Sequence, residues 1–283
     1  MIDTEFESLV STEWLAVHLQ SPGVKVIDGS WYLPKTGRDA EAEYQASHIP
    51  GAVFFDIDEI ADSDDPLPHM LPSVEKFTSR MRALGLGDGD RIVVYDGTGL
   101  MSAARVWWTF RVFGHEDVAV LNGGLPKWRA EGRSLVSGNV VPQRRHFTAV
   151  FEADRVSAID DVHINLASGG AQIVDARSRG RFHGEEPEPR SGLRAGHIPQ
   201  SLNLPYTDLI DPAEGTLLPV GRLRRIFRES GIDLDKPVIA SCGSGISAAV
   251  IAFALDRLGH SQVAVYDGSW AEWGGLPDTP VDR

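Results

Sequence analysis

The sequence predicts two consecutive α/β domains, each with a mainly parallel sheet flanked by helices. Two observations lead to this prediction. Four short motifs occur twice in the same order, at a spacing of about 147 residues. In both halves, short runs rich in valine and isoleucine alternate with helical patterns, which is typical of parallel strands covered on both faces. The length of 283 residues agrees with two domains.

The repeated motifs are KVIDGS and QIVDAR, SHIPGA and GHIPQS, VVYDGTG and IASCGSG, and VAVLNGGLPKW and VAVYDGSWAEW. Four ordered matches with a nearly constant spacing indicate a tandem duplication. The positions that they pair are Asp28 with Asp175, His48 with His197, Asp96 with Cys242, and Trp128 with Trp273.

The predicted strands are VKVID, RIVVYD and VAVL in the first half, and AQIVDA, KPVIAS and QVAVYD in the second. Helices are expected over residues 73–84, 102–113, 220–230 and 246–258, with Ser73 as the N-cap of the first. A glycine that can adopt a left-handed conformation follows each helix. These glycines are Gly85, Gly114, Gly231 and Gly259.

The domain boundaries follow from the same pattern. The stretch from about Gly132 to Val150 has few periodic apolar residues and is expected to be a connector. We therefore predict a first domain over residues 8–135, a connector over 136–152 and a second domain over 153–283.

Composition excludes several classes of protein. Hydrophobic residues make up 42% and charged residues 24%, as in ordinary globular proteins. The net charge of −13 argues against a nucleic-acid partner. No apolar run approaches the roughly 20 residues that span a bilayer, and the acidic start MIDTEFESLVSTEW lacks the pattern of a secretion signal, so a cytoplasmic protein without membrane contact is expected. No motif for a cofactor or a metal is present.

The chain contains a single cysteine, Cys242, so it cannot form an internal disulfide. A lone cysteine is often just a small buried apolar side chain. Here, however, the strand KPVIAS leads into Cys-Gly-Ser-Gly and a helix follows. Gly243 and Gly245 permit a tight turn whose N–H groups bind an anion, and the helix dipole favours a thiolate. This setting predicts a nucleophile.

These motifs resemble those of tandem rhodanese-domain sulfurtransferases. The likeness runs from about Trp14 to Trp273 and rests on the two HIP segments, the closing DGSWAEW and the one cysteine in the second repeat. Within that family, CGSG followed by ISA is similar to the 3-mercaptopyruvate sulfurtransferases. Relatives that prefer thiosulfate carry basic residues after the cysteine, where this chain has Gly243 and Ser244. The resemblance implies two rhodanese-like domains, of which only the second carries a nucleophile.

The resemblance also implies a reaction. Cys242 would take sulfur from 3-mercaptopyruvate as a persulfide, pyruvate would leave, and the sulfur would pass to thioredoxin, a small thiol or cyanide, without a cofactor. Arg181 and Arg190, in GRFHGEEPEPRSG, match the arginines with which the family binds the substrate carboxylate. An alternative is that they only neutralise the glutamates beside them. Gly243 and Gly245 would line the substrate site.

The family pattern further implies that Asp58, His69 and Ser244 handle the proton. Because Asp58 and His69 belong to the first repeat, the reaction site is expected between the domains. Alternatively, Asp58 is a helix cap and His69 an ordinary loop histidine. The first repeat carries Asp96 in place of the cysteine, so that features present in both repeats, such as His48 and His197, are more consistent with a role in loop packing.

One other function is disfavoured at this point and two remain open. A cysteine phosphatase needs an arginine six positions after the cysteine, and Ala248 stands there. A thiosulfate sulfurtransferase would use the same chemistry with a dianionic donor, although the loop lacks cations. A non-enzymatic persulfide carrier would keep the cysteine but use neither arginine.

Overall fold

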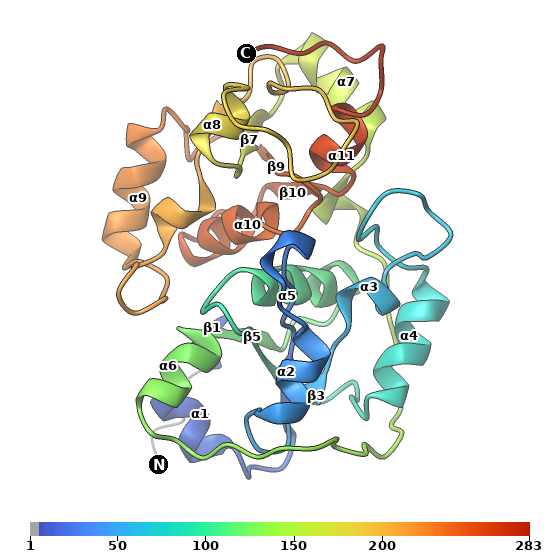
Figure 1. Cartoon of the computed structure of the whole chain (residues 1–283), viewed down its shortest axis with the longest axis vertical. Coiled ribbons are helices and arrows are strands. Elements are labelled where there is room, and N and C mark those ends of the chain that lie inside the picture. The colour runs from blue at the N-terminus through green and yellow to red at the C-terminus, as the bar shows by residue number, and fades with distance from the viewer. Residues whose placement is uncertain (1–5) are drawn as a thin grey trace. The chain divides into compact units, whose positions relative to one another are not determined.

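The computed structural model describes residues 6–283 and divides into two units, one for each repeat (Figure 1). The first five residues of the acidic start lie outside the described residues. The first unit holds residues up to 60, 72–151 and 212–217, and the second holds 61–71, 152–211 and 218–283. Among the described residues, none of the helices is long and apolar enough to cross a bilayer.

The first unit contains a five-stranded parallel sheet with the order β1-β5-β4-β2-β3. Its strands are β1 (Leu9–Val10), β2 (Val24–Asp28), β3 (Val53–Phe54), β4 (Arg91–Tyr95) and β5 (Val118–Leu121). Its helices are α1 (Thr12–His18), α2 (Ala40–Ala46), α3 (Ile57–Ile60), α4 (Val74–Ala83), α5 (Ser102–Val112) and α6 (Gly124–Ala130), with the 3-10 turn η1 (Pro34–Thr36).

The second unit repeats this sheet, with the order β6-β10-β9-β7-β8 and all neighbours parallel. Its strands are β6 (Val156–Ser157), β7 (Gln172–Asp175), β8 (Leu202–Asn203), β9 (Val238–Ser241) and β10 (Val263–Tyr266). Its helices are α7 (Ile159–Ser168), α8 (Arg179–Phe182), α9 (Val220–Glu229), α10 (Ala248–Arg257) and α11 (Ser269–Trp273), with the 3-10 turns η2 (Ala153–Arg155) and η3 (Tyr206–Leu209). The predicted fold class, two parallel α/β domains, is confirmed.

The four predicted helices correspond to α4, α5, α9 and α10, with ends that differ by at most two residues. Ser73 caps α4 as expected, because its hydroxyl accepts the N–H of Lys76. Sequence patterns missed the two-residue strands β1, β3, β6 and β8 and the short helices, since such elements contain too few residues to show a period.

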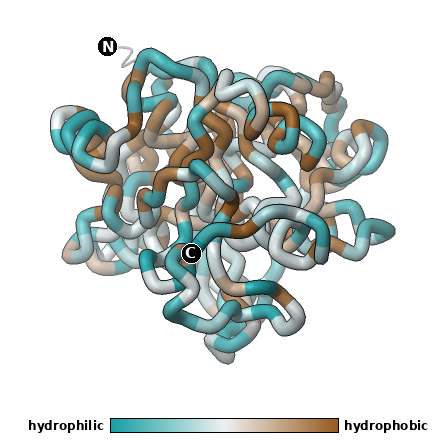
Figure 2. Tube along the Cα trace, turned by 90° about the horizontal axis from the view of Figure 1, so that it is seen from above, coloured by the Kyte–Doolittle hydropathy of each residue, from teal (hydrophilic) through white to brown (hydrophobic). Residues whose placement is uncertain are grey.

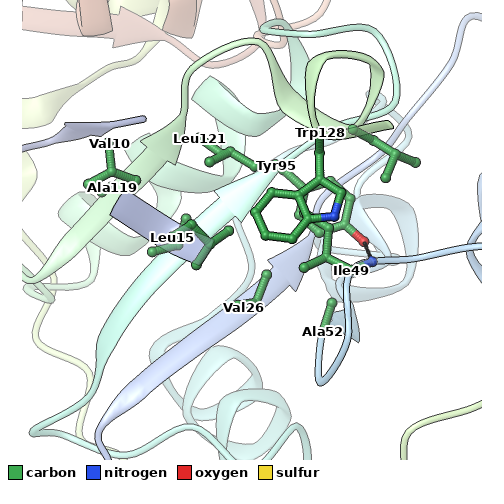
Figure 3. Packing of buried hydrophobic residues seen from close by; sticks show 11 residues of the cluster. Val10, Leu15, Val26, Ile49, Ala52, Tyr95, Ala119, Leu121 and Trp128 are labelled. Atoms are coloured by element: carbon green, nitrogen blue, oxygen red, sulfur yellow. Dashed lines mark hydrogen bonds between the residues drawn. The ribbon is translucent and has the colours of Figure 1, made fainter. Parts of the chain in front are cut away.

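Equivalent tryptophans anchor the two hydrophobic cores. In the first unit, the Tyr95 hydroxyl accepts the N–H of Ile49. Trp128 belongs to the core cluster that also contains Val10, Leu15 and Tyr95 (Figure 3). Its indole N–H donates to the carbonyl of residue 134 at 2.9 Å. Truncation of a core tryptophan costs about 3–5 kcal/mol, because a large cavity remains. Along the chain, hydrophobic segments lie inside and many outer loops are hydrophilic (Figure 2).

In the second unit, Trp273 takes the place of Trp128. It belongs to the core cluster that contains Ile173 and Trp270, and its indole N–H donates to the carbonyl of Pro280 at 2.8 Å. The agreement of both packing and hydrogen bond supports the duplication that the sequence predicts.

The duplicated histidines have the packing role that the sequence analysis predicts. His48 stacks on Tyr44 and bonds its carbonyl through Nδ1 at 2.8 Å, and His197 stacks on Phe182 and bonds its carbonyl at 2.9 Å. Each histidine also forms a single antiparallel bridge, His48 with Val136 and His197 with Asp282. Both imidazoles are therefore committed to structure.

The predicted connector packs along the first unit. Val136 pairs with His48, and the ring of Phe147 is fully buried against Phe77 and Phe110. Phe147 alone of the connector's large apolar side chains is fully buried, whereas Val141 and Val150 are exposed, which explains why the segment shows no periodicity.

Candidate active site

Cys242 lies between the end of β9 and the start of α10, where the sequence places it. Its side chain is a free thiol and only 2% of the residue is exposed. The chain turns through Gly245, whose φ of 76° is a left-handed conformation that glycine adopts without strain. The carboxyl end of a parallel sheet is where ligands of α/β proteins bind.

The turn leaves N–H groups available for an anion. Among the described residues, the N–H groups of Gly243, Ser244, Ile246 and Ser247 donate no hydrogen bond. They come directly before a helix whose residues from Ala248 to Leu255 are all buried. Together with the positive end of the helix dipole, they form a site that favours negative charge.

The segment at the start of α11 holds the turn in place. The N–H of Trp270 donates to the carbonyl of Cys242 at 3.1 Å, and the N–H of Ala271 donates to the carbonyl of Gly243 at 2.8 Å. The Ser269 hydroxyl accepts the N–H groups of Cys242 and Gly245 at 3.1 and 3.2 Å. The carbonyls of Cys242 and Gly243 are therefore bound by this segment, while the remaining N–H groups of the loop have no acceptor among the described residues.

The equivalent turn of the first unit shows what these N–H groups bind. The carboxylate of Asp96, which is fully buried, accepts the N–H groups of Thr98, Gly99, Met101 and Ala103 at 2.7–2.9 Å. It also accepts the Thr98 hydroxyl at 2.7 Å. The same loop geometry thus holds an anionic side chain at the position that corresponds to Cys242.

Arg181 stands beside the cysteine loop. It lies in α8, and its Nη2 would be 2.9 Å from a Cβ atom at Gly243. Glu188 holds the guanidinium, with Nη2 at 2.6 Å from one carboxylate oxygen and Nε at 3.3 Å from the other. Arg181 is therefore paired with one of the neighbouring glutamates, and the same pairing aims its guanidinium at the loop.

Arg177, for which no role is predicted from the sequence, is buried and connects several side chains near the loop. Its guanidinium bonds the carboxylates of Asp175 and Glu188 and lies 4.4 Å above the ring of Trp270. Burial lowers the pKa of Arg177, but the two carboxylates outweigh it and the pKa is raised overall. Glu188 thus joins two arginines, Arg177 in the core and Arg181 at the loop.

His69 and Arg190 contact each other, although the family resemblance implies different roles for them. Arg190 Nη2 donates to His69 Nε2 at 3.0 Å, so this nitrogen carries no proton. His69 belongs to the first repeat in sequence, but it lies in residues 61–71, which are part of the second unit. The Asp267 carboxylate accepts the N–H of Leu71 at 2.7 Å and fixes this segment next to the DGSW turn.

Asp58 is in α3 of the first unit and is exposed. Its carboxylate accepts the indole N–H of Trp31 at 3.0 Å. The helix-cap interpretation of Asp58 is wrong, because Asp56 caps α3 by accepting the N–H groups of Asp58 and Glu59. Ser244 is 5% exposed and lies two residues after the cysteine, and its N–H is one of those that donate no hydrogen bond within the described part of the chain.

One further ionisable pair lies next to the loop. The hydroxyl of Tyr266, at the end of β10, donates to Glu272 at 2.8 Å. Burial, and then the Glu272 carboxylate, raise the pKa of Tyr266. Burial also raises the pKa of Glu272, although the hydrogen bond from Tyr266 lowers it. The pair supports the turn between β10 and α11, which carries Ser269.

The family follows from a match over both units. A model of the rhodanese-like domain matches residues 11–131 and again residues 158–276. The chain belongs to the rhodanese family. The structure thus confirms the two rhodanese-like domains that the motifs implied.

Named relatives extend this result over nearly the whole chain. A human protein named 3-mercaptopyruvate sulfurtransferase is 44% identical, over 94% of this chain and 91% of its own. An Arabidopsis thaliana protein named thiosulfate/3-mercaptopyruvate sulfurtransferase 1, mitochondrial, is 45% identical, over 98% of this chain and 78% of its own. The crystal structure of a 3-mercaptopyruvate sulfurtransferase from Escherichia coli superposes with a TM-score of 0.86 at 42% identity, over 93% of this chain and 98% of that one.

Three residues of this rhodanese site escaped the sequence analysis. Glu188 stands among several glutamates, and nothing in the sequence marks the one that binds the arginines. Asp267 and Ser269 belong to the quoted DGSWAEW motif, but that motif was used only as a repeat landmark and as part of the family resemblance. A closer comparison with the first repeat, where Gly124 stands opposite Ser269, is the signal that was available.

We predict that Asp96→Ala strongly destabilises the first rhodanese-like unit. The substitution removes the acceptor of four loop N–H groups and leaves buried donors unsatisfied. The expected loss is about 3 kcal/mol in the free energy of unfolding, measured by urea denaturation. As a control, Asp88→Ala removes a carboxylate that bonds Thr148 at the surface and should cost less than about 1 kcal/mol. Equal stability of both variants would contradict the assigned role of Asp96.

Proposed function

We propose that this chain transfers sulfur from 3-mercaptopyruvate to a thiol or to cyanide through a persulfide on Cys242. The thiolate attacks the substrate sulfur, a sulfur–sulfur bond forms, and the carbon–sulfur bond breaks. The electrons of that bond stay on carbon as the enolate of pyruvate, which takes up a proton and leaves. An acceptor then removes the outer sulfur and restores the thiol.

The observation that carries this proposal is the set of open N–H groups around a buried cysteine. A persulfide is an anion near neutral pH, and its outer sulfur is as many bonds from Cα as the carboxylate oxygens of Asp96. In the first unit the loop N–H groups bind those oxygens at 2.7–2.9 Å. The corresponding N–H groups of Ser244 and Ser247 are open. They are suited to bind the outer sulfur of a Cys242 persulfide.

For the substrate carboxylate we propose Arg181 and Arg190, with Gly243 and Gly245 lining the same site. A guanidinium donates two parallel hydrogen bonds to a carboxylate, which a glutamate partner on its other edge does not prevent. Arg181 is positioned at Gly243 by Glu188, and Arg190 contacts His69. An acidic chain with a net charge of −13 needs such local cations to bind an anionic substrate.

For the proton we propose Ser244, His69 and Asp58. A serine hydroxyl two residues from the nucleophile is able to pass a proton to the enolate carbon, with an imidazole and a carboxylate as its reservoir. The hydrogen bond from Arg190 to His69 Nε2 links the proposed carboxylate-binding residue to the proposed proton carrier. Asp58 keeps its carboxylate at the surface of the first unit, bonded to Trp31.

A second candidate function, that of a thiosulfate sulfurtransferase, differs from the first only in the sulfur donor. A dianionic donor such as thiosulfate favours cationic side chains in the loop, and Gly243 and Ser244 supply none. The name of the Arabidopsis relative includes both donors, so thiosulfate is expected as a weaker substrate. A pure persulfide carrier would not need Arg181 next to the loop. The acceptor and a cytoplasmic location remain predictions.

The test is a paired assay of the purified chain with cyanide as acceptor. One series contains 3-mercaptopyruvate and the other thiosulfate, with thiocyanate and pyruvate as products to measure. We expect kcat/KM for 3-mercaptopyruvate to be at least about tenfold higher, a difference of about 1.4 kcal/mol in transition-state binding. A preference for thiosulfate would show that the chain is a thiosulfate sulfurtransferase. Absence of turnover with both donors would favour the non-enzymatic persulfide carrier.

A separate prediction concerns Arg190. Because it is proposed to bind the substrate carboxylate, Arg190→Ala should lower kcat/KM for 3-mercaptopyruvate by about 10- to 100-fold, mainly through KM. Arg179→Ala is the matched control, since Arg179 pairs with Asp208 at the surface of the same segment. The control should keep kcat/KM within about twofold of the unmodified chain. Unchanged kinetics of the Arg190 variant would remove this residue from the site.

A further inference from the structure

Ser269 has a backbone conformation that is costly for serine. Its φ is 49°, in the left-handed region, and the residue is fully buried. The equivalent position of the first unit is Gly124, with a φ of 53°. The fold therefore requires the same left-handed turn in both units, and glycine meets that requirement without strain. A serine in this position needs a compensating interaction.

The hydroxyl supplies that interaction at the cysteine loop. Ser269 Oγ accepts the N–H of Cys242 at 3.1 Å and the N–H of Gly245 at 3.2 Å. It donates its own proton to the carbonyl of Tyr266 at 2.7 Å, so both lone pairs face the loop. One hydroxyl thus binds the nucleophile residue itself and the glycine three positions later.

Comparison of the two units shows why the second needs this hydroxyl. In the first unit the N–H of Gly99 is bound by the carboxylate of Asp96 at 2.9 Å. Gly245 corresponds to Gly99, but Cys242 has no carboxylate to accept its N–H. Ser269 takes over this donor, while the N–H groups of other loop residues remain open for sulfur.

We propose that Ser269 is a positioning residue for the Cys242 nucleophile. It fixes the backbone on both sides of the turn, so that the open N–H groups point at the sulfur before substrate arrives. Preorganised donors stabilise a developing anion better than donors that must first reorient. The proposal rests on the proposed role of Cys242 as the nucleophile, and it assigns Ser269 to the reactivity of the sulfur and not to binding of the donor.

The decisive variant is Ser269→Gly. It removes the hydroxyl and also relieves the backbone strain, because Gly124 shows that the turn accepts glycine. Two rates are measured, the kcat of sulfur transfer and the rate of alkylation of Cys242 by iodoacetamide at pH 7. Since Cys242 is the sole cysteine, the alkylation reports on this thiol alone. Ser269→Ala is the companion variant, which loses the hydroxyl but keeps the strain.

We expect both rates to fall about tenfold in Ser269→Gly, with KM for 3-mercaptopyruvate within about twofold and the thermal midpoint within about 3 °C of the unmodified chain. Ser269→Ala should lose the same activity and more stability. The control Ser201→Ala removes a hydroxyl that bonds only the carbonyl of Ile198 and should change neither rate.

Alkylation at an unchanged or higher rate in Ser269→Gly would overturn the proposal, and so would a loss of activity that merely follows a lower thermal midpoint. The alkylation assay needs no sulfur donor. If the unmodified chain transfers sulfur from neither donor, the proposed function fails, while the alkylation rates still decide the role of Ser269.

Discussion

The rest of the second unit depends on one constraint: the backbone after β9 must turn into α10 while several buried N–H groups remain unpaired next to Cys242. Unpaired donors in the interior are unfavourable, so the turn does not hold itself together. Its carbonyls and two of its N–H groups are bound by the segment that starts at Ser269. That segment is anchored in turn, since Trp270 packs against Arg177, and Arg177 shares Glu188 with Arg181. One chain of contacts therefore links Cys242 to Arg181.

The duplication provides an internal comparison for this arrangement. In the first unit the same turn binds its own carboxylate, that of Asp96, and the loop is closed to any other anion. In the second unit a shorter, polarisable side chain leaves the donors open. The exchange of one residue thus separates a turn whose donors are bound from a turn whose donors are open. The change from Gly124 to Ser269 belongs to the same divergence, because the hydroxyl binds a donor that the lost carboxylate no longer reaches.

The sequence predicted the parts of the fold that repeat or that have a period. The six longer strands, the four long helices and the strand–turn–helix setting of Cys242 followed from apolar runs and glycines. It could not predict that Glu188 is the glutamate that orients Arg181, because Glu185 and Glu186 lie beside it in an irregular loop. Nor could it place His69, whose segment belongs to the first repeat along the chain but to the second unit in its contacts. Such long-range partners depend on tertiary packing.

The mass of the peptide that contains Cys242 is the most direct test of this account. The chain is incubated with 3-mercaptopyruvate without an acceptor, digested under non-reducing conditions and analysed by mass spectrometry. The account predicts that this peptide gains the mass of one sulfur atom, that pyruvate is released in equal amount, and that cyanide returns the peptide to its original mass. Release of pyruvate with an unmodified Cys242 peptide would contradict it, because the sulfur would then leave without passing through the loop.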